Sequence, residues 1–130
     1  DLYNNPISPY VTSFFGETNK FLGIVNNSQV KTSIGTIPIK NIPDTKKVEI
    51  HVRPQAIRLT QEKTPVNGIK GTVMASKLMG SYSFIHLSVL DKNNNVIHVH
   101  SHMPPNFNPK QSTAVGIEID TEKIFIFPKD

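Results

Sequence analysis

Short apolar runs, each ended by a proline, a glycine or a group of asparagines, govern what this chain can fold into. The sequence holds ten prolines and seven glycines in 130 residues. Proline cannot donate a backbone hydrogen bond inside a helix or a strand, and glycine weakens both elements. Runs of this length are too short for ordinary helices but fit strands of about four to eight residues. The sequence therefore predicts an all-β protein.

Alternation of apolar and polar residues supports this prediction in three segments, 46–53, 81–90 and 95–103. Side chains of a strand point to opposite faces in turn, so each segment has one face for the core. The second and third segments are separated by the five residues DKNNN, which predict a hairpin loop. Gly71 and Gly80 bracket a long strand that we expect to bend or bulge.

The first sixteen residues differ in kind and predict a short amphipathic helix. Pro9 suits a first helical turn, and Gly16 suits the end of the helix. The apolar face of this helix would hold Tyr10, Val11, Phe14 and Phe15. Such a face needs a partner surface, either on the β domain or on a preceding domain.

Several classes of function are disfavoured by what the sequence lacks. It has no cysteine, no phosphate-binding loop and no GxSxG serine motif. Its formal charge of +4 is spread along the chain, and Lys46 and Lys47 are the only adjacent basic pair. No apolar run reaches the roughly 20 residues that span a bilayer. We expect no enzyme, no nucleic-acid partner and no membrane insertion.

Histidines form the one constellation with metal-binding potential. His98, His100 and His102 alternate along one strand, and a register in which paired residue numbers sum to 186 places His86 opposite His100. Neutral imidazole suits zinc, nickel or copper. The interpretation that the sequence favours is that these are ordinary polar residues of a solvent or dimer face.

Four motifs, in order, resemble the TOBE regulatory domain of ABC-importer ATP-binding subunits of the maltose, polyamine and ferric-iron type. The opening DLYNNP and FFGETN resemble the junction between the ATPase domain and the regulatory domain. VEIHVRPQAIRL resembles the family's VRPE strand and turn, although Gln55 replaces the usual acidic residue. GTVMASKLMGS and VGIEIDTEKIFIFP resemble a glycine-bracketed hairpin and the closing signature with Asp120 and Phe127.

This resemblance implies a domain division and a missing catalytic part. Residues 1–16 would be the C-terminal remnant of the ATPase domain, and residues 17–130 the regulatory domain of small oligonucleotide/oligosaccharide-binding-type (OB-type) barrels. Two such barrels would share strands from both halves of the chain. ATP and magnesium would bind only the upstream ATPase domain, with no cofactor in this chain. The parent would be an ATPase that is cytoplasmic and bound to the inner membrane through the transporter.

The resemblance also implies partners: a second copy, the chain's own ATPase domain and the membrane subunits of the transporter. Tyr82, Phe84, Phe125 and Phe127 are the candidate dimer contacts, although Phe125 and Phe127 would serve equally well in the domain's own core. Ferric iron or a polyamine is favoured over a sugar as the transported substrate.

Two other functions remain open from the sequence. One is a small-ligand or oxyanion-binding TOBE module, in which Lys77 with Ser76, Ser81 and Ser83 would supply the donors. The other is a nucleic-acid-binding OB-like barrel, for which exposed aromatic residues would stack on bases.

Overall fold

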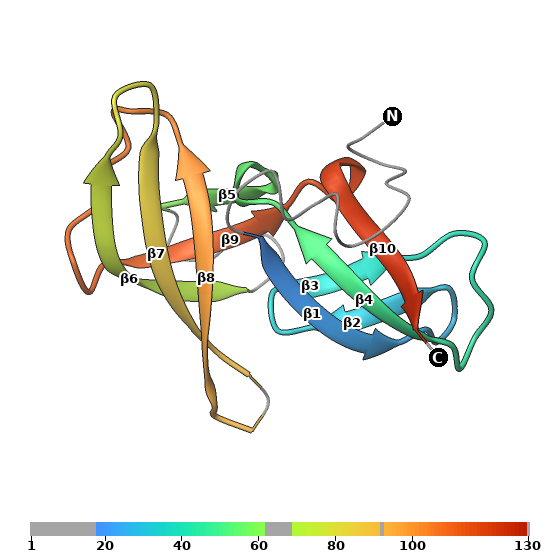
Figure 1. Cartoon of the computed structure of the whole chain (residues 1–130). Coiled ribbons are helices and arrows are strands. Elements are labelled where there is room, and N and C mark those ends of the chain that lie inside the picture. The colour runs from blue at the N-terminus through green and yellow to red at the C-terminus, as the bar shows by residue number, and fades with distance from the viewer. Residues whose placement is uncertain (1–17, 62–68, 92, 130) are drawn as a thin grey trace.

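The computed structural model describes residues 18–61, 69–91 and 93–129, and this part of the chain is all-β, as predicted. Ten strands form two units that lie side by side (Figure 1). The first unit contains β1 (Asn19–Ile24), β2 (Gln29–Thr32), β3 (Gly35–Pro38), β4 (Lys47–Val52) and β10 (Ile124–Lys129). The second contains β5 (Ile57–Thr60), β6 (Lys70–Leu78), β7 (Ser83–Leu90), β8 (Val96–Met103) and β9 (Ala114–Ile119). The helix predicted over residues 1–16 lies outside the described residues.

The first unit combines a three-stranded antiparallel sheet, in the order β1-β4-β10, with the hairpin β2-β3. The segment before β2 turns at Asn27 and Ser28, whose φ angles are 55° and 59°. Two consecutive positive φ angles are typical of the tight turns that join strands with a right-handed twist. The Asn-Asn-Ser segment at residues 26–28 thus forms a tight turn.

The second unit is a five-stranded antiparallel sheet in the order β5-β9-β6-β7-β8. The register of β6 against β7 shifts between Val73 and Ala75, which is the irregularity expected between the two glycines. This sheet curls so that its outer strands approach each other. Ser101 of β8 donates a hydrogen bond of 2.6 Å from Oγ to the backbone oxygen of Ile57 at the start of β5.

The chain crosses between the units twice, each time at a single 3-10 turn. η1 (Pro54–Ala56) leads from β4 into β5, and η2 (Thr121–Lys123) leads from β9 back to β10. The two crossings are joined, because the backbone N–H of Asp120 donates to the oxygen of Ala56 at 2.8 Å. Strands from both halves of the sequence therefore build each unit, as expected. Because the chain connects the two units twice, cutting the backbone at one place would not divide it into two fragments that each contain one complete unit.

The buried core is almost entirely aliphatic and runs through both units. Its members with no exposed area include Val25, Ile34, Ile37, Ile50, Val52, Ile57, Val73, Ile85, Leu87, Val99 and Ile117. Ser83, Ile85, Leu87 and Val89 form the inner face of β7, in agreement with the alternation of the sequence. None of the helices in the described residues is long and apolar enough to cross a membrane.

The sheet of the first unit is covered on both faces along β4 and β10. Ile124 and Phe125 are neighbours on opposite faces, yet their exposed fractions are 6% and 0%. His51 lies on the face that alternation predicts to be polar, but only 1% of it is exposed. Its ring meets Phe127 edge-on, with 4.9 Å between centroids. Phe125 and Phe127 are thus buried within the chain, which favours their alternative role as residues that fill the domain's own interior.

Candidate functional site: a strip of aromatic and histidine rings

The outer face of the β7–β8 hairpin carries six rings, which we call the ring strip. Its members are Tyr82, Phe84, His86, His98, His100 and His102. They lie together because each strand alternates between a core face and an outer face. The sequence predicted this face as the site of the metal candidates and of two of the four dimer candidates, Tyr82 and Phe84.

Strand pairing agrees with the register proposed from the sequence. Phe84 lies opposite His102, and His86 lies opposite His100. The register is fixed by the hairpin loop, in which the Asp91 carboxylate oxygen Oδ1 accepts backbone hydrogen bonds from Asn93 and Asn95, each of 2.8 Å. A short loop held in this way leaves no room for a slip of one residue.

Neighbouring rings in the strip are in contact along its length. Tyr82 stacks on His102 with 4.2 Å between ring centroids. Phe84 lies between His102 and His100, at centroid distances of 5.6 and 5.2 Å. His86 in turn lies 4.9 Å from the centroid of His100. The strip therefore has an aromatic end, where Tyr82 and Phe84 contact His102, and an imidazole end, where His86 and His98 lie.

The imidazole end of the strip contains a direct contact between two histidines. His86 Nε2 lies 3.0 Å from His98 Nδ1. Only one of these nitrogens needs to carry a hydrogen for a hydrogen bond, so the other presents a lone pair. Among the described residues no group of three or more His, Cys, Asp or Glu side chains is arranged to hold a metal ion. The structure thus brings the candidate ligands His86 and His98 into direct contact between ring nitrogens, and the ring of His100 also contacts that of His86.

Two of the four residues considered for oxyanion binding, Ser76 and Ser83, make hydrogen bonds within the chain. Ser83 is fully buried and donates from Oγ toward Asn108 Oδ1 at 2.6 Å. Ser76 donates from Oγ to the backbone oxygen of Pro109 at 2.8 Å. Lys77 and Ser81 are exposed. The hydroxyls of Ser76 and Ser83 thus donate their hydrogen bonds to the loop after β8 and not to a ligand.

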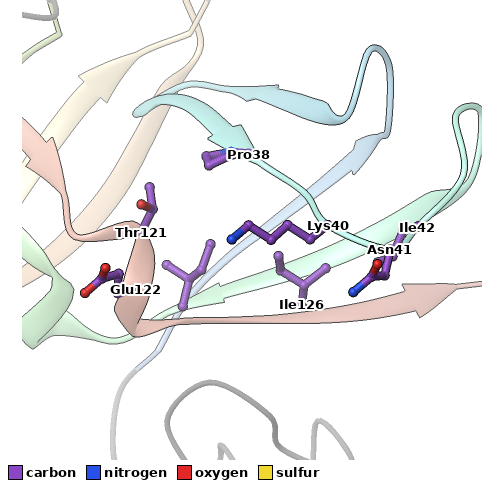
Figure 2. A pocket seen from close by; sticks show the side chains of 8 residues that line it. Pro38, Lys40, Asn41, Ile42, Thr121, Glu122 and Ile126 are labelled. Atoms are coloured by element: carbon purple, nitrogen blue, oxygen red, sulfur yellow. The ribbon is translucent and has the colours of Figure 1, made fainter.

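A groove beside β10 was not foreseen from the sequence (Figure 2). It has a volume of about 660 Å³ and is lined by Pro38, Lys40, Asn41, Ile42, Thr121, Glu122, Ile124 and Ile126. Figure 2 shows the Lys40 side chain extending across it toward η2. Residues 38–42 and 121–126 are far apart in the sequence, and the closing signature that contains residues 121–126 gives no indication of a contact with residues 38–42. No local signal could have found it.

The decisive comparison is with protein families: the model of the TOBE domain matches residues 50–127. This chain belongs to the TOBE domain family. The match extends from the middle of β4 to β10 and so includes all of the second unit. TOBE domains are non-catalytic, in agreement with the expectation drawn from the sequence.

Curated relatives of this TOBE domain are ATP-binding subunits of importers. It is 28% identical over 92 residues to the sulfate/thiosulfate import ATP-binding protein CysA of Bacillus cereus. This alignment covers 67% of this chain and 25% of that protein. It is 27% identical over 138 residues to the Fe(3+) ions import ATP-binding protein FbpC of Fusobacterium nucleatum, covering 100% of this chain and 35% of that protein. The chain thus spans only a minor part of either relative.

Among solved structures, the TOBE chain resembles the cytoplasmic molybdate-binding protein ModG in its molybdate-bound form. The TM-score is 0.52 at 11% identity, covering 83% of this chain and 94% of that chain. At this identity the likeness shows the fold alone. It confirms the OB-like TOBE architecture.

The motif residues that carried the resemblance have structural roles in the TOBE fold. Asn19 of the FFGETN motif is 6% exposed, and its side chain bonds to the backbone of Val52 and His100. Gly71 lies so close to Ile117 that a Cβ there would be 2.9 Å from Cδ1 of that residue. Asp120 caps η2 by accepting a hydrogen bond of 3.2 Å from the backbone of Glu122. These motifs identify the fold rather than a reactive site.

Proposed function

We propose that this chain is the regulatory and dimerisation domain of an ABC-importer ATP-binding subunit. The observation that carries the proposal is the TOBE match over residues 50–127, together with a relative that aligns over the whole chain and is an import ATP-binding protein. Residues 1–16 would be the end of the ATPase domain, and residues 17–130 the regulatory domain. ATP and magnesium would then bind upstream, and the subunit would reach the membrane through the other transporter subunits.

The dimer contact that we propose is the aromatic end of the ring strip. Tyr82 and Phe84 are half-buried there rather than covered. The adjoining end of the β6–β7 hairpin exposes Leu78 by 59% and Met79 by 45%. Large apolar side chains gathered at one end of a sheet are typical of protein–protein contacts. Phe125 and Phe127 do not contribute to this proposed surface, because both are buried.

For the transported substrate we propose an inorganic ion, with ferric iron ahead of sulfate. The relative named for Fe(3+) aligns over the whole of this chain, whereas the relatives named for sulfate and thiosulfate align over 67% of it. A polyamine, which the sequence placed beside ferric iron, appears in none of these names.

The test uses the parent subunit in its natural importer and compares it with a variant that ends at residue 16 of this chain. We expect the intact subunit to hydrolyse ATP and to support uptake of radiolabelled ferric iron but not of labelled sulfate. We expect the truncated subunit to keep nucleotide binding and to lose regulation or stable pairing of the subunits. A parent sequence without a phosphate-binding loop and an ABC signature would reject the proposal. Uptake of sulfate alone would reject only the assignment of iron.

A further inference from the structure

Two imidazole nitrogens face each other at the histidine end of the ring strip. His86 Nε2 and His98 Nδ1 are 3.0 Å apart on neighbouring strands. We propose that this pair binds one divalent cation of borderline softness, Zn²⁺, Ni²⁺ or Cu²⁺. The proposal concerns only these side chains and does not depend on the importer assignment.

The separation of the two nitrogens fits shared coordination. Imidazole nitrogens bind Zn²⁺ at about 2.0–2.1 Å. Two ligands at that distance are roughly 2.9 Å apart when they subtend a right angle at the metal, and roughly 3.3 Å apart at the tetrahedral angle. The observed 3.0 Å lies between these values. For both facing nitrogens to bind the metal, the hydrogen between them moves to the far nitrogen of its own ring, so that both imidazoles stay neutral and each presents a lone pair to the metal.

The strands hold this pair in place at little further cost. His86 and His98 are on opposite strands of a hairpin with continuous pairing from Ser83 to Leu90, so no loop has to close for both to reach one ion. His98 lies opposite Ser88, whereas His86 lies opposite His100. A small rotation of the two rings would turn the lone pairs from each other toward a common point above the sheet.

The neighbourhood sets the kind of ion and limits the affinity. Ala75 lies opposite His86 on β6, and Lys77 lies opposite Phe84, so β6 places no carboxylate beside the pair among the residues that the structure describes. Without carboxylates the pair offers nothing that Mg²⁺ or Ca²⁺ prefers, since both select oxygen ligands. Because no third ligand is arranged beside the pair in the described residues, water would complete the coordination.

The experiment is calorimetric titration of the chain, without a histidine tag, with ZnCl₂, NiCl₂ and MgCl₂ at neutral pH. We expect saturable binding of one Zn²⁺ or Ni²⁺ per chain and none of Mg²⁺. His86→Gln and His98→Gln should each weaken binding by at least about tenfold, a loss that removing even a supporting group can cause. His102→Gln is the matched control. It removes a histidine from the same face, where Tyr82 stacks on its ring, and should leave the affinity unchanged.

A second measurement keeps the proposal independent of folding defects in the variants. Imidazole nitrogen resonances of the unaltered chain report which ring nitrogen is bound, so zinc should shift His86 Nε2 and His98 Nδ1 and leave the ring nitrogens of His51 in place. Binding that survives both substitutions, that depends equally on His102, or that cannot be saturated at millimolar metal would overturn the proposal.

Discussion

Asn19 and His100 are joined by hydrogen bonds in both directions between one side chain and one backbone. Oδ1 of Asn19 accepts from the backbone N–H of His100 at 2.8 Å, and Nδ2 donates to the backbone oxygen of His100 at 3.0 Å. The same Nδ2 also donates to the oxygen of Val52 at 2.9 Å. The Asn19 amide thus makes, at the outer edge of β8, hydrogen bonds of the kind that a neighbouring strand would make. These bonds connect the first unit to the second.

Replacing Asn19 with alanine should destabilise the whole chain. The substitution removes three hydrogen bonds and leaves the backbone of His100 with fewer partners in a partly buried place. At about 1 kcal/mol for each bond, the free energy of unfolding should fall by about 3 kcal/mol. Urea denaturation followed by fluorescence or circular dichroism measures this change. Asn93→Ala, on an exposed residue of the β7–β8 loop, should change stability by no more than about 0.5 kcal/mol.

The β7–β8 hairpin could be predicted from the sequence in detail. Alternation fixed which residues share a face, and the five-residue loop allowed the register that is observed, in which His86 lies opposite His100. Both signals are local, since the two strands and their loop are contiguous. The contact between His86 and His98, in contrast, is diagonal, and depends on how the two rings rotate.

What alternation cannot tell is whether a second face of a sheet is covered. His51 belongs to the face of β4 with Glu49 and Arg53, which the pattern marks as polar, yet it is buried beside Phe127. Covering that face depends on contacts between segments that are distant in the sequence. The groove beside β10 escaped prediction for the same reason, because it joins Lys40 to Thr121 and Glu122.

Gly71→Ala should destabilise the second unit through one identifiable clash. The new Cβ would lie 2.9 Å from Cδ1 of Ile117 and 3.4 Å from the backbone oxygen of Ser88. Ile117 has no exposed area, so its end cannot swing into solvent. Overpacking of this kind costs about 1–3 kcal/mol, measurable as a lower midpoint of urea unfolding.

The partner variant for this test is Ile117→Val, which removes the Cδ1 atom in question. Alone it should cost about 0.5–1.5 kcal/mol, as loss of a buried methyl group does. Combined with Gly71→Ala it should lose clearly less than the sum of the two single losses, because the clash is gone. Strict additivity would show that the cost of the alanine arises elsewhere.

His51 should make the stability of the chain fall in mild acid. Burial lowers the pKa of His51, and the nearby Glu49 carboxylate opposes that shift only in part. Lys20 and Lys129 add to the lowering. In the unfolded chain His51 takes up a proton near its ordinary pKa of about 6.5. In the folded chain it takes up that proton only at a lower pH. The free energy of unfolding should therefore drop as the pH falls below about 6.5, until His51 also becomes charged in the folded chain.

The measurement compares urea unfolding at about pH 7.5 and about pH 5.5 for the unaltered chain, His51→Gln and Glu49→Gln. His51→Gln should show a smaller loss of stability in acid, whatever its stability at the higher pH. Glu49→Gln should show a larger loss, because it removes the carboxylate that raises the pKa of His51. An identical loss in all three proteins would place the pH dependence on other groups.

The proposed dimer predicts a specific sensitivity to charge at the aromatic end of the ring strip. Tyr82 stacks on His102 and adjoins Met79, whose backbone N–H donates to the oxygen of Tyr82 at 2.9 Å. A carboxylate placed there would have to be desolvated when two copies meet. Tyr82→Glu should therefore raise the dimer dissociation constant about tenfold or more, which corresponds to at least about 1.4 kcal/mol.

Sedimentation equilibrium measures that constant, and the control places the same charge on a distant surface. Thr36→Glu lies on the exposed side of β3 in the first unit and should leave dimerisation unchanged. If both substitutions weakened the dimer equally, net charge rather than the ring strip would be responsible. If the unaltered chain stayed monomeric at roughly tens of micromolar, where a contact of about −6 to −7 kcal/mol would already pair it, the strip would not be a dimer surface for this chain. The aromatic rings would then serve the hairpin itself, by packing against the histidines of β8.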